Sequence, residues 1–152
     1  MRIILSLLLS LIVTPLFGQV DGRGIFCDLN TAKVEALNAI KENGILSGVD
    51  PKEMKIGFFF KEGLAFSVSP QIRNDVAFYV KSSFGDKYQV DANNITWDDA
   101  LLDRKTLILI SNNVGELQCE VFGTQTSFDR ETEKLRKELQ ALYEVQLEGN
   151  RI

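Results

Sequence analysis

The sequence predicts a mainly β protein of the α+β class, an antiparallel meander or small barrel-like sheet with two added helices. Short segments in which apolar and polar residues alternate follow one another between 55 and 122, separated by turns rich in Gly, Asn and Asp. The apolar spacing changes to that of a helix near 31–43 and again after 127. A content of 45% hydrophobic and 25% charged residues over 152 residues is typical of a globular protein.

The first residues have the order of features of a secretory signal. A basic start at Arg2 precedes the apolar run 3–13, Pro15 interrupts any helix, and the small Gly18 suits a cleavage site. The run is shorter than the roughly 20 residues that a membrane span needs. We therefore expect a signal peptide at 1–18 and an exported chain, periplasmic or secreted, without a stable membrane span. A retained N-terminal anchor is the alternative.

The remaining chain divides into a β-rich domain over 19–126 and a C-terminal helical tail over 127–152. The domain holds one insert helix near 31–43, which Asn30 is expected to cap and Gly44 to end. The apolar face of this helix comprises Val34, Leu37 and Ile40.

The strands are predicted from period-two alternation and from the turns between them. Residues 61–63 are expected to form a three-residue hairpin loop, with Gly63 where φ must be positive. Three consecutive phenylalanines cannot face one side of a strand, so we expect Phe59 to lie under the C-terminal or the first helix. The expected strands are 24–28, 55–60, 64–69, 76–80, 88–90, 95–97, 106–110 and 117–122.

The two cysteines, Cys27 and Cys119, fall in the first and last expected strands. Export to an oxidising compartment favours a disulfide between them. Closing a loop of about 90 residues stabilises a fold by roughly 4–5 kcal/mol in the chain-entropy model. Two free buried thiols and a redox pair are the alternatives, although the Cys-x-x-Cys spacing of redox pairs is absent.

The tail is predicted to be an amphipathic helix over about 128–147, with Ser127 as its N-cap. Its apolar stripe has two interpretations. The stripe packs against the sheet of the same chain, or it binds a protein partner or a second copy. The stripe comprises Phe128, Leu135, Leu139 and Leu142.

An ordered series of short pieces runs through most of residues 22–140: Gly22–Cys27, Gly57–Phe60 with Gly63, Ile95–Trp97, Leu102–Leu107 and Gln118–Phe122. Together with the charged helical tail, the series resembles an uncharacterised family of small exported β-rich proteins from marine bacterial and phage-associated sequences. The resemblance implies a single cysteine-paired β domain and brings no activity, cofactor or catalytic residue. By fold analogy the meander is also similar to lipocalin-like small barrels, which often hold an apolar ligand.

Most catalytic chemistries lack their residues in this chain. The sequence has no histidine, which excludes Ser-His-Asp and Cys-His sets and removes the commonest metal ligand. A Gly-x-Gly start at Gly22 has Cys27 in place of the third glycine of a dinucleotide loop. A net charge of −4 argues against nucleic acid as a binding partner. We expect no enzymatic activity, no cofactor and no metal.

Acidic and amide side chains gather between 86 and 103, and such oxygen ligands suit Ca²⁺. Ile95 stands where the next ligand of a loop beginning at Asp91 belongs. We therefore interpret these residues as solvated turns beside strands, with a calcium site as the weaker alternative. The residues are Asp86, Asp91, Asn93, Asn94, Asp98, Asp99 and Asp103.

Aromatic residues are the remaining signal. Most are expected in the core, and some could line a cavity. The function that we predict is an exported, non-enzymatic small domain that binds a small apolar ligand; the alternative is a protein–protein interaction module that acts through the C-terminal helix. The candidate lining residues are Phe59, Phe66, Phe78 and Trp97.

Overall fold

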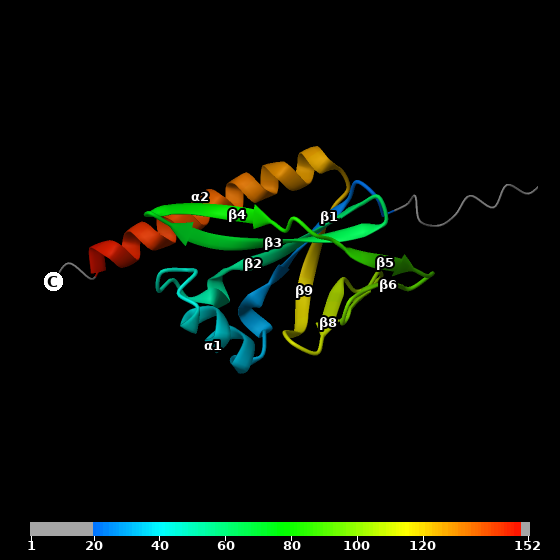
Figure 1. The fold of residues 1–152 in the computed structure, drawn as a ribbon, viewed down its shortest axis with the longest axis horizontal. Helices are drawn as coiled ribbons and strands as arrows, with labels where there is room; N and C mark the ends of the chain where they lie inside the picture. Colours follow the sequence, from blue (N-terminus) through cyan, green and yellow to red (C-terminus); the bar gives the residue numbers. More distant parts are fainter. Residues whose placement is uncertain (1–19, 150–152) are drawn as a thin grey trace, which may run out of the picture.

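Eight antiparallel strands close into a barrel in the computed structural model, which describes residues 20–149 (Figure 1). Around the barrel the order is β2-β1-β9-β8-β7-β6-β5-β3, and pairing of β3 with β2 closes the ring. The predicted fold class is confirmed, and the predicted signal peptide lies outside the described residues. The strands are β1 (Gly24–Asp28), β2 (Lys55–Lys61), β3 (Leu64–Arg73), β5 (Asp86–Val90), β6 (Asn94–Trp97), β7 (Ala100–Asp103), β8 (Ile108–Ser111) and β9 (Gly115–Phe122).

Alternation along the strands separates an inner from an outer face. On β1 and β2, Ile25 and Phe60 belong to the main core inside the barrel, whereas Phe26 and Phe59 belong to a second core outside it. Successive side chains of a strand point to opposite faces, so a barrel strand buried on both sides has apolar residues at every position. This double burial explains the run of three phenylalanines.

The second core lies between the sheet and α2 (Gln125–Gly149). The Phe128 ring stacks on Phe26, with ring centroids 4.7 Å apart, and lies 5.2 Å from the Phe59 ring. Phe59 is only 1% exposed. The prediction that one of the two helices covers Phe59 is therefore confirmed, and the helix is the C-terminal one.

Two glycines allow the aromatic rings this close approach. A Cβ atom at Gly24 would stand 2.1 Å from the Phe128 ring, and one at Gly57 would stand 2.6 Å from the Phe26 ring. Separations this short are far inside van der Waals contact. A larger residue at either position would displace the Phe128 or the Phe26 ring and disturb the packing between α2 and the sheet.

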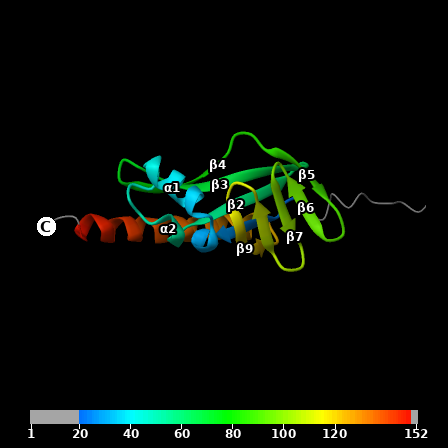
Figure 2. The same ribbon diagram turned by 90° about the horizontal axis from the view of Figure 1, so that it is seen from below.

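A ninth strand, β4 (Val76–Lys81), pairs only with the second half of β3 and extends the sheet beyond the barrel. Figure 2 shows the barrel strands at one end of the long axis, with α2 reaching toward the other. The outer edge of β4 meets α2: Ala77 N–H donates to Gln140 Oε1 at 2.8 Å, and Gln140 Nε2 donates to the Asp75 carbonyl at 3.2 Å. The side chain of Gln140 thus takes the place of a neighbouring strand.

The helix α2 begins earlier than the sequence predicts. Thr124 and Ser127 exchange hydrogen bonds, from Ser127 N–H to Thr124 Oγ1 at 3.1 Å and from Thr124 N–H to Ser127 Oγ at 3.2 Å. This reciprocal pair has the geometry of a capping box. Ser127 therefore lies inside the first turn, and the prediction that it is the N-cap is wrong.

The insert helix α1 (Val34–Glu42) is shorter than predicted. In the view of Figure 1 it lies below β2, whereas α2 lies above β4. Helix α1 follows a 3₁₀ turn, η2 (Leu29–Thr31), and its N-cap is Lys33 without a side-chain bond, so Asn30 does not cap it. Gly44 follows the helix with φ of +64°, as predicted. A second 3₁₀ turn, η3 (Pro51–Glu53), leads into β2.

Two details of the sheet correct the prediction. The β2–β3 loop contains only Glu62 and Gly63, with φ of 54° and 74°, because Lys61 pairs with Leu64. Both residues are left-handed, which suits the twist of a hairpin. The strand β7 was not predicted, because the two-residue turn at 98–99 leaves little sequence between it and β6.

The predicted disulfide is present. Cys27 and Cys119 are partners in the register of β1 and β9, with Cα atoms 3.9 Å apart. The N–H of Cys119 donates to the Leu107 carbonyl on the other side of β9, so the cysteines form a non-hydrogen-bonded pair, where side chains are closest. The bond thus joins the first and last strands of the barrel.

Among the helices of residues 20–149, none is both long and apolar enough to cross a bilayer.

Candidate functional site: the mouth of the barrel

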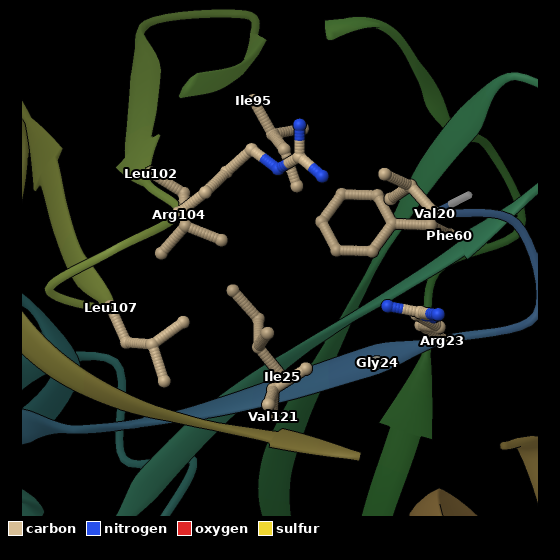
Figure 3. A pocket seen from close by; sticks show the side chains of 10 residues that line it. All are labelled: Val20, Arg23, Gly24, Ile25, Phe60, Ile95, Leu102, Arg104, Leu107 and Val121. Carbon is tan, nitrogen blue, oxygen red and sulfur yellow. The ribbon is translucent and has the colours of Figure 1, made fainter. Parts of the chain in front are cut away.

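A cavity of about 170 Å³ opens at the end of the barrel where β1 begins and β9 ends (Figure 3). Six apolar side chains from five strands and one turn face it, together with Val20 and two arginines. An apolar cavity of about 150 Å³ is large enough to bind benzene. The lining residues are Val20, Arg23, Gly24, Ile25, Phe60, Ile95, Leu102, Arg104, Leu107 and Val121.

The floor of the cavity is aromatic. The Phe60 ring makes edge contacts with Tyr88 and Trp97, with ring centroids 5.4 and 5.3 Å away. All three side chains are at most 4% exposed. They fill the barrel interior behind the cavity, so the cavity is a mouth and not a channel through the molecule.

Burial, and then the hydrogen bond to Asp21, raise the pKa of the Tyr88 phenol.

One wall is the segment that leads into β1. Gly22 N–H donates to the Phe60 carbonyl at 2.8 Å, and Phe60 N–H donates to the Arg23 carbonyl at 2.9 Å. These bonds extend the β1–β2 ladder to the residues that precede the start of β1. Val20 is held by this segment with its side chain only 4% exposed.

A tight turn after β7 forms the second wall. The Asp103 carboxylate accepts hydrogen bonds from Thr106 and Lys105 N–H, both at 2.8 Å, and these bonds lower the pKa of Asp103. Leu107 then adopts a φ of +57°, which is uncommon for a residue with a bulky side chain. Its N–H donates to the Asp103 carbonyl at 2.9 Å, which holds this conformation. Figure 3 shows the Leu107 side chain directed into the cavity.

The turn between β5 and β6 positions Arg104. The Asp91 carboxylate accepts hydrogen bonds from Asn93 and Asn94 N–H, both at 2.7 Å, which lowers the pKa of Asp91. Arg104 N–H donates to the Asn93 carbonyl at 2.7 Å, and Arg104 Nη1 donates to the Asp91 carbonyl at 2.8 Å. The prediction of a turn is confirmed for Asp91, whereas Asp103 is the last residue of β7 and its carboxylate holds the turn that follows.

The opposite end of the barrel is acidic. Asp86, Asp98 and Asp99 line a separate cavity of about 160 Å³ there. Asp99 Oδ2 accepts hydrogen bonds from Ser111 Oγ at 2.9 Å and Asn113 Nδ2 at 3.0 Å. Within residues 20–149, no group of three or more acidic or cysteine side chains is arranged to hold a metal ion.

The four candidate lining residues do not share a cavity. Phe59 is buried under α2, and Phe66 lies on the same outer face, with Lys81 Nζ 4.4 Å above its ring. Phe78 is 42% exposed on β4, and Trp97 fills the barrel interior. The separation follows from the alternation of strand faces. The same alternation, applied to Ile25, Ile95, Leu102 and Val121, would have indicated the actual lining.

The stripe predicted as a candidate interface is already occupied. Phe128, Leu135 and Leu139 are at most 5% exposed, and Leu142 is half-buried. They pack against strands of the same chain, as the first interpretation of the tail expects. Exposed apolar side chains lie outside this stripe: Val76, Phe78 and Val80 on β4 are each about 40% exposed, and Val145 and Leu147 are exposed near the end of α2.

The fold and the site together define a small, closed antiparallel barrel with an apolar mouth. Comparisons with protein-family models, with curated proteins and with solved structures found no match to this chain. The family resemblance stated from the sequence therefore stays a prediction.

Proposed function

We propose that this chain is an exported, non-enzymatic binding protein that holds a small apolar molecule in the mouth of its barrel. The observation that supports this most directly is the cavity of about 170 Å³, whose lining is mainly apolar. Apolar lining with a few polar groups is the usual character of a small-molecule site. Export is supported by the signal-like sequence of residues 1–18 and fits the Cys27–Cys119 disulfide.

The size of the cavity indicates the size of the ligand. A volume near that of a benzene site suits one ring or a chain of about six carbons. Burial of each methylene contributes about 0.8 kcal/mol, so a neutral six-carbon molecule should bind with a Kd in the millimolar range. The natural ligand can extend beyond the mouth and bind more tightly.

The alternative, an interaction module acting through α2, has less support. Its proposed contact residues, Phe128, Leu135 and Leu139, are buried against the sheet of the same chain. A partner could reach them only after α2 had left the sheet.

The test is a titration with 1-hexanol, followed by the methyl NMR shifts of the protein. Saturable shifts confined to the methyl groups that line the cavity, among them those of Leu102, Leu107 and Val121, are expected. Val121→Trp should abolish them by filling the mouth, because Val121 lines the cavity but is 49% exposed and tolerates a larger side chain. Val145→Trp, at a position 69% exposed on α2, is the matched control. Shifts that do not saturate, or that survive Val121→Trp, would contradict the proposal.

A further inference from the structure

Two arginines line a cavity that is otherwise apolar, in a chain whose net charge is −4. Arg23 comes from the segment before β1 and Arg104 from the turn after β7, 81 positions later in the sequence. Figure 3 shows their guanidinium groups on different sides of the Phe60 ring. The closed barrel thus brings two cations from distant parts of the chain to one opening.

Neither guanidinium forms an ion pair within 4.0 Å with an acidic side chain of residues 20–149, although Asp91 lies near enough to Arg104 for the guanidinium charge to contribute to the lowered pKa of Asp91. The ion pairs within 4.0 Å among residues 20–149 all involve other cations. The turn carboxylates Asp91 and Asp103 each accept backbone N–H groups of their own turns. Arg104 uses Nη1 for the Asp91 carbonyl, which anchors the side chain and leaves other N–H donors of the fork for a ligand.

A guanidinium beside apolar surface has a specific chemical preference. Its planar fork matches the oxygens of a carboxylate, sulfonate or phosphate, and such charge-assisted bonds are stronger than neutral ones. The charged side chains that line the two cavities differ in sign: Arg23 and Arg104 line the mouth, whereas Asp86, Asp98 and Asp99 line the cavity at the far end. An anion would therefore be favoured at the mouth and disfavoured at the other end.

We infer that the mouth binds an amphipathic anion, with the apolar part in the cavity and the anionic head between Arg23 and Arg104. This inference rests on the proposed function, because the apolar part needs the same cavity. It adds a ligand class, a short apolar chain or ring that carries one acidic group, and it assigns the two arginines to the head.

The experiment compares two probes that share a six-carbon body, hexanoate and 1-hexanol, at pH 7 and low salt. Hexanoate should bind at least tenfold more tightly. Arg23→Gln and Arg104→Gln should each reduce its affinity at least threefold and leave the affinity for 1-hexanol unchanged. Arg130→Gln, at an exposed position on α2, removes the same charge away from the mouth and should change neither affinity. Arg23 is exposed, so its variant tests the inference even if Arg104→Gln disturbs the turn.

The outcomes separate the two proposals. If 1-hexanol binds and hexanoate binds no more tightly, the arginines only cover apolar surface, so the inference fails and the proposed function stands. If hexanoate binds more tightly but Arg130→Gln weakens it as much as Arg23→Gln does, the attraction is not local and the inference also fails. If neither probe binds, the proposed function fails and the inference fails with it.

Discussion

The stacking of Phe128 predicts that α2 is part of the folded core and not a detachable tail. Phe128 is 3% exposed and lies between the rings of Phe26, Phe59 and Phe122. Phe128→Ala removes the whole ring and leaves a cavity between helix and sheet. Replacing a buried phenylalanine by alanine costs about 3–5 kcal/mol. Against a total stability of about 5–15 kcal/mol, this loss is a large fraction.

Urea denaturation with two probes checks this prediction. The single tryptophan, Trp97, is 4% exposed inside the barrel, so its fluorescence reports unfolding of the barrel and not of α2. Far-UV circular dichroism reports the helix. Both probes should give one transition, shifted by the same free energy. Val145→Ala on the same helix, at a position 69% exposed, should change stability by less than about 0.5 kcal/mol.

Two results would refute this reasoning. A loss below about 1 kcal/mol for Phe128→Ala would mean that the ring is not packed as the structure shows. A helix signal that melts at lower urea than the Trp97 signal in the unaltered protein would mean that α2 separates from an intact barrel. The interaction-module alternative would then gain support.

Three further predictions follow from particular contacts. Replacing both Cys27 and Cys119 by alanine should lower the free energy of unfolding by about 4–5 kcal/mol, since the bond spans 92 positions; an unchanged urea midpoint would contradict this. Burial raises the pKa of Tyr79, so its neutral phenol stabilises the fold below pH 10 and this contribution is lost above it. Stability should then fall by up to about 1.4 kcal/mol per pH unit above pH 10, and Tyr79→Phe should remove that part of the slope. Gln140→Leu leaves the N–H of Ala77 without its acceptor and should cost about 1–3 kcal/mol in urea unfolding; no loss would show that water replaces the amide.

The alternation of apolar residues and the turn chemistry are local properties, so the sequence alone indicated most strands, both helices and the fold class. Gly44 after α1 is an example, because a left-handed residue at a helix end needs no information from the rest of the chain. The pairing of Cys27 with Cys119 also followed, because only two cysteines are present. Helix starts were less certain: Thr124 and Ser127 are both plausible caps, and only their mutual bonds decide between them.

The site depended on tertiary structure. Sequence reasoning chose Phe59 and Phe78 for their aromatic character, but whether a side chain faces the inside of a barrel, a covering helix or solvent depends on how the strands close and where α2 packs. Arg23 and Arg104 carry no signal in the sequence, since Arg23 stands between two glycines and Arg104 lies in the turn sequence Asp103-Arg104-Lys105. Only closure of the ring, which pairs strands far apart in the chain, brings them to one mouth, and contacts of that kind are not determined by any short segment.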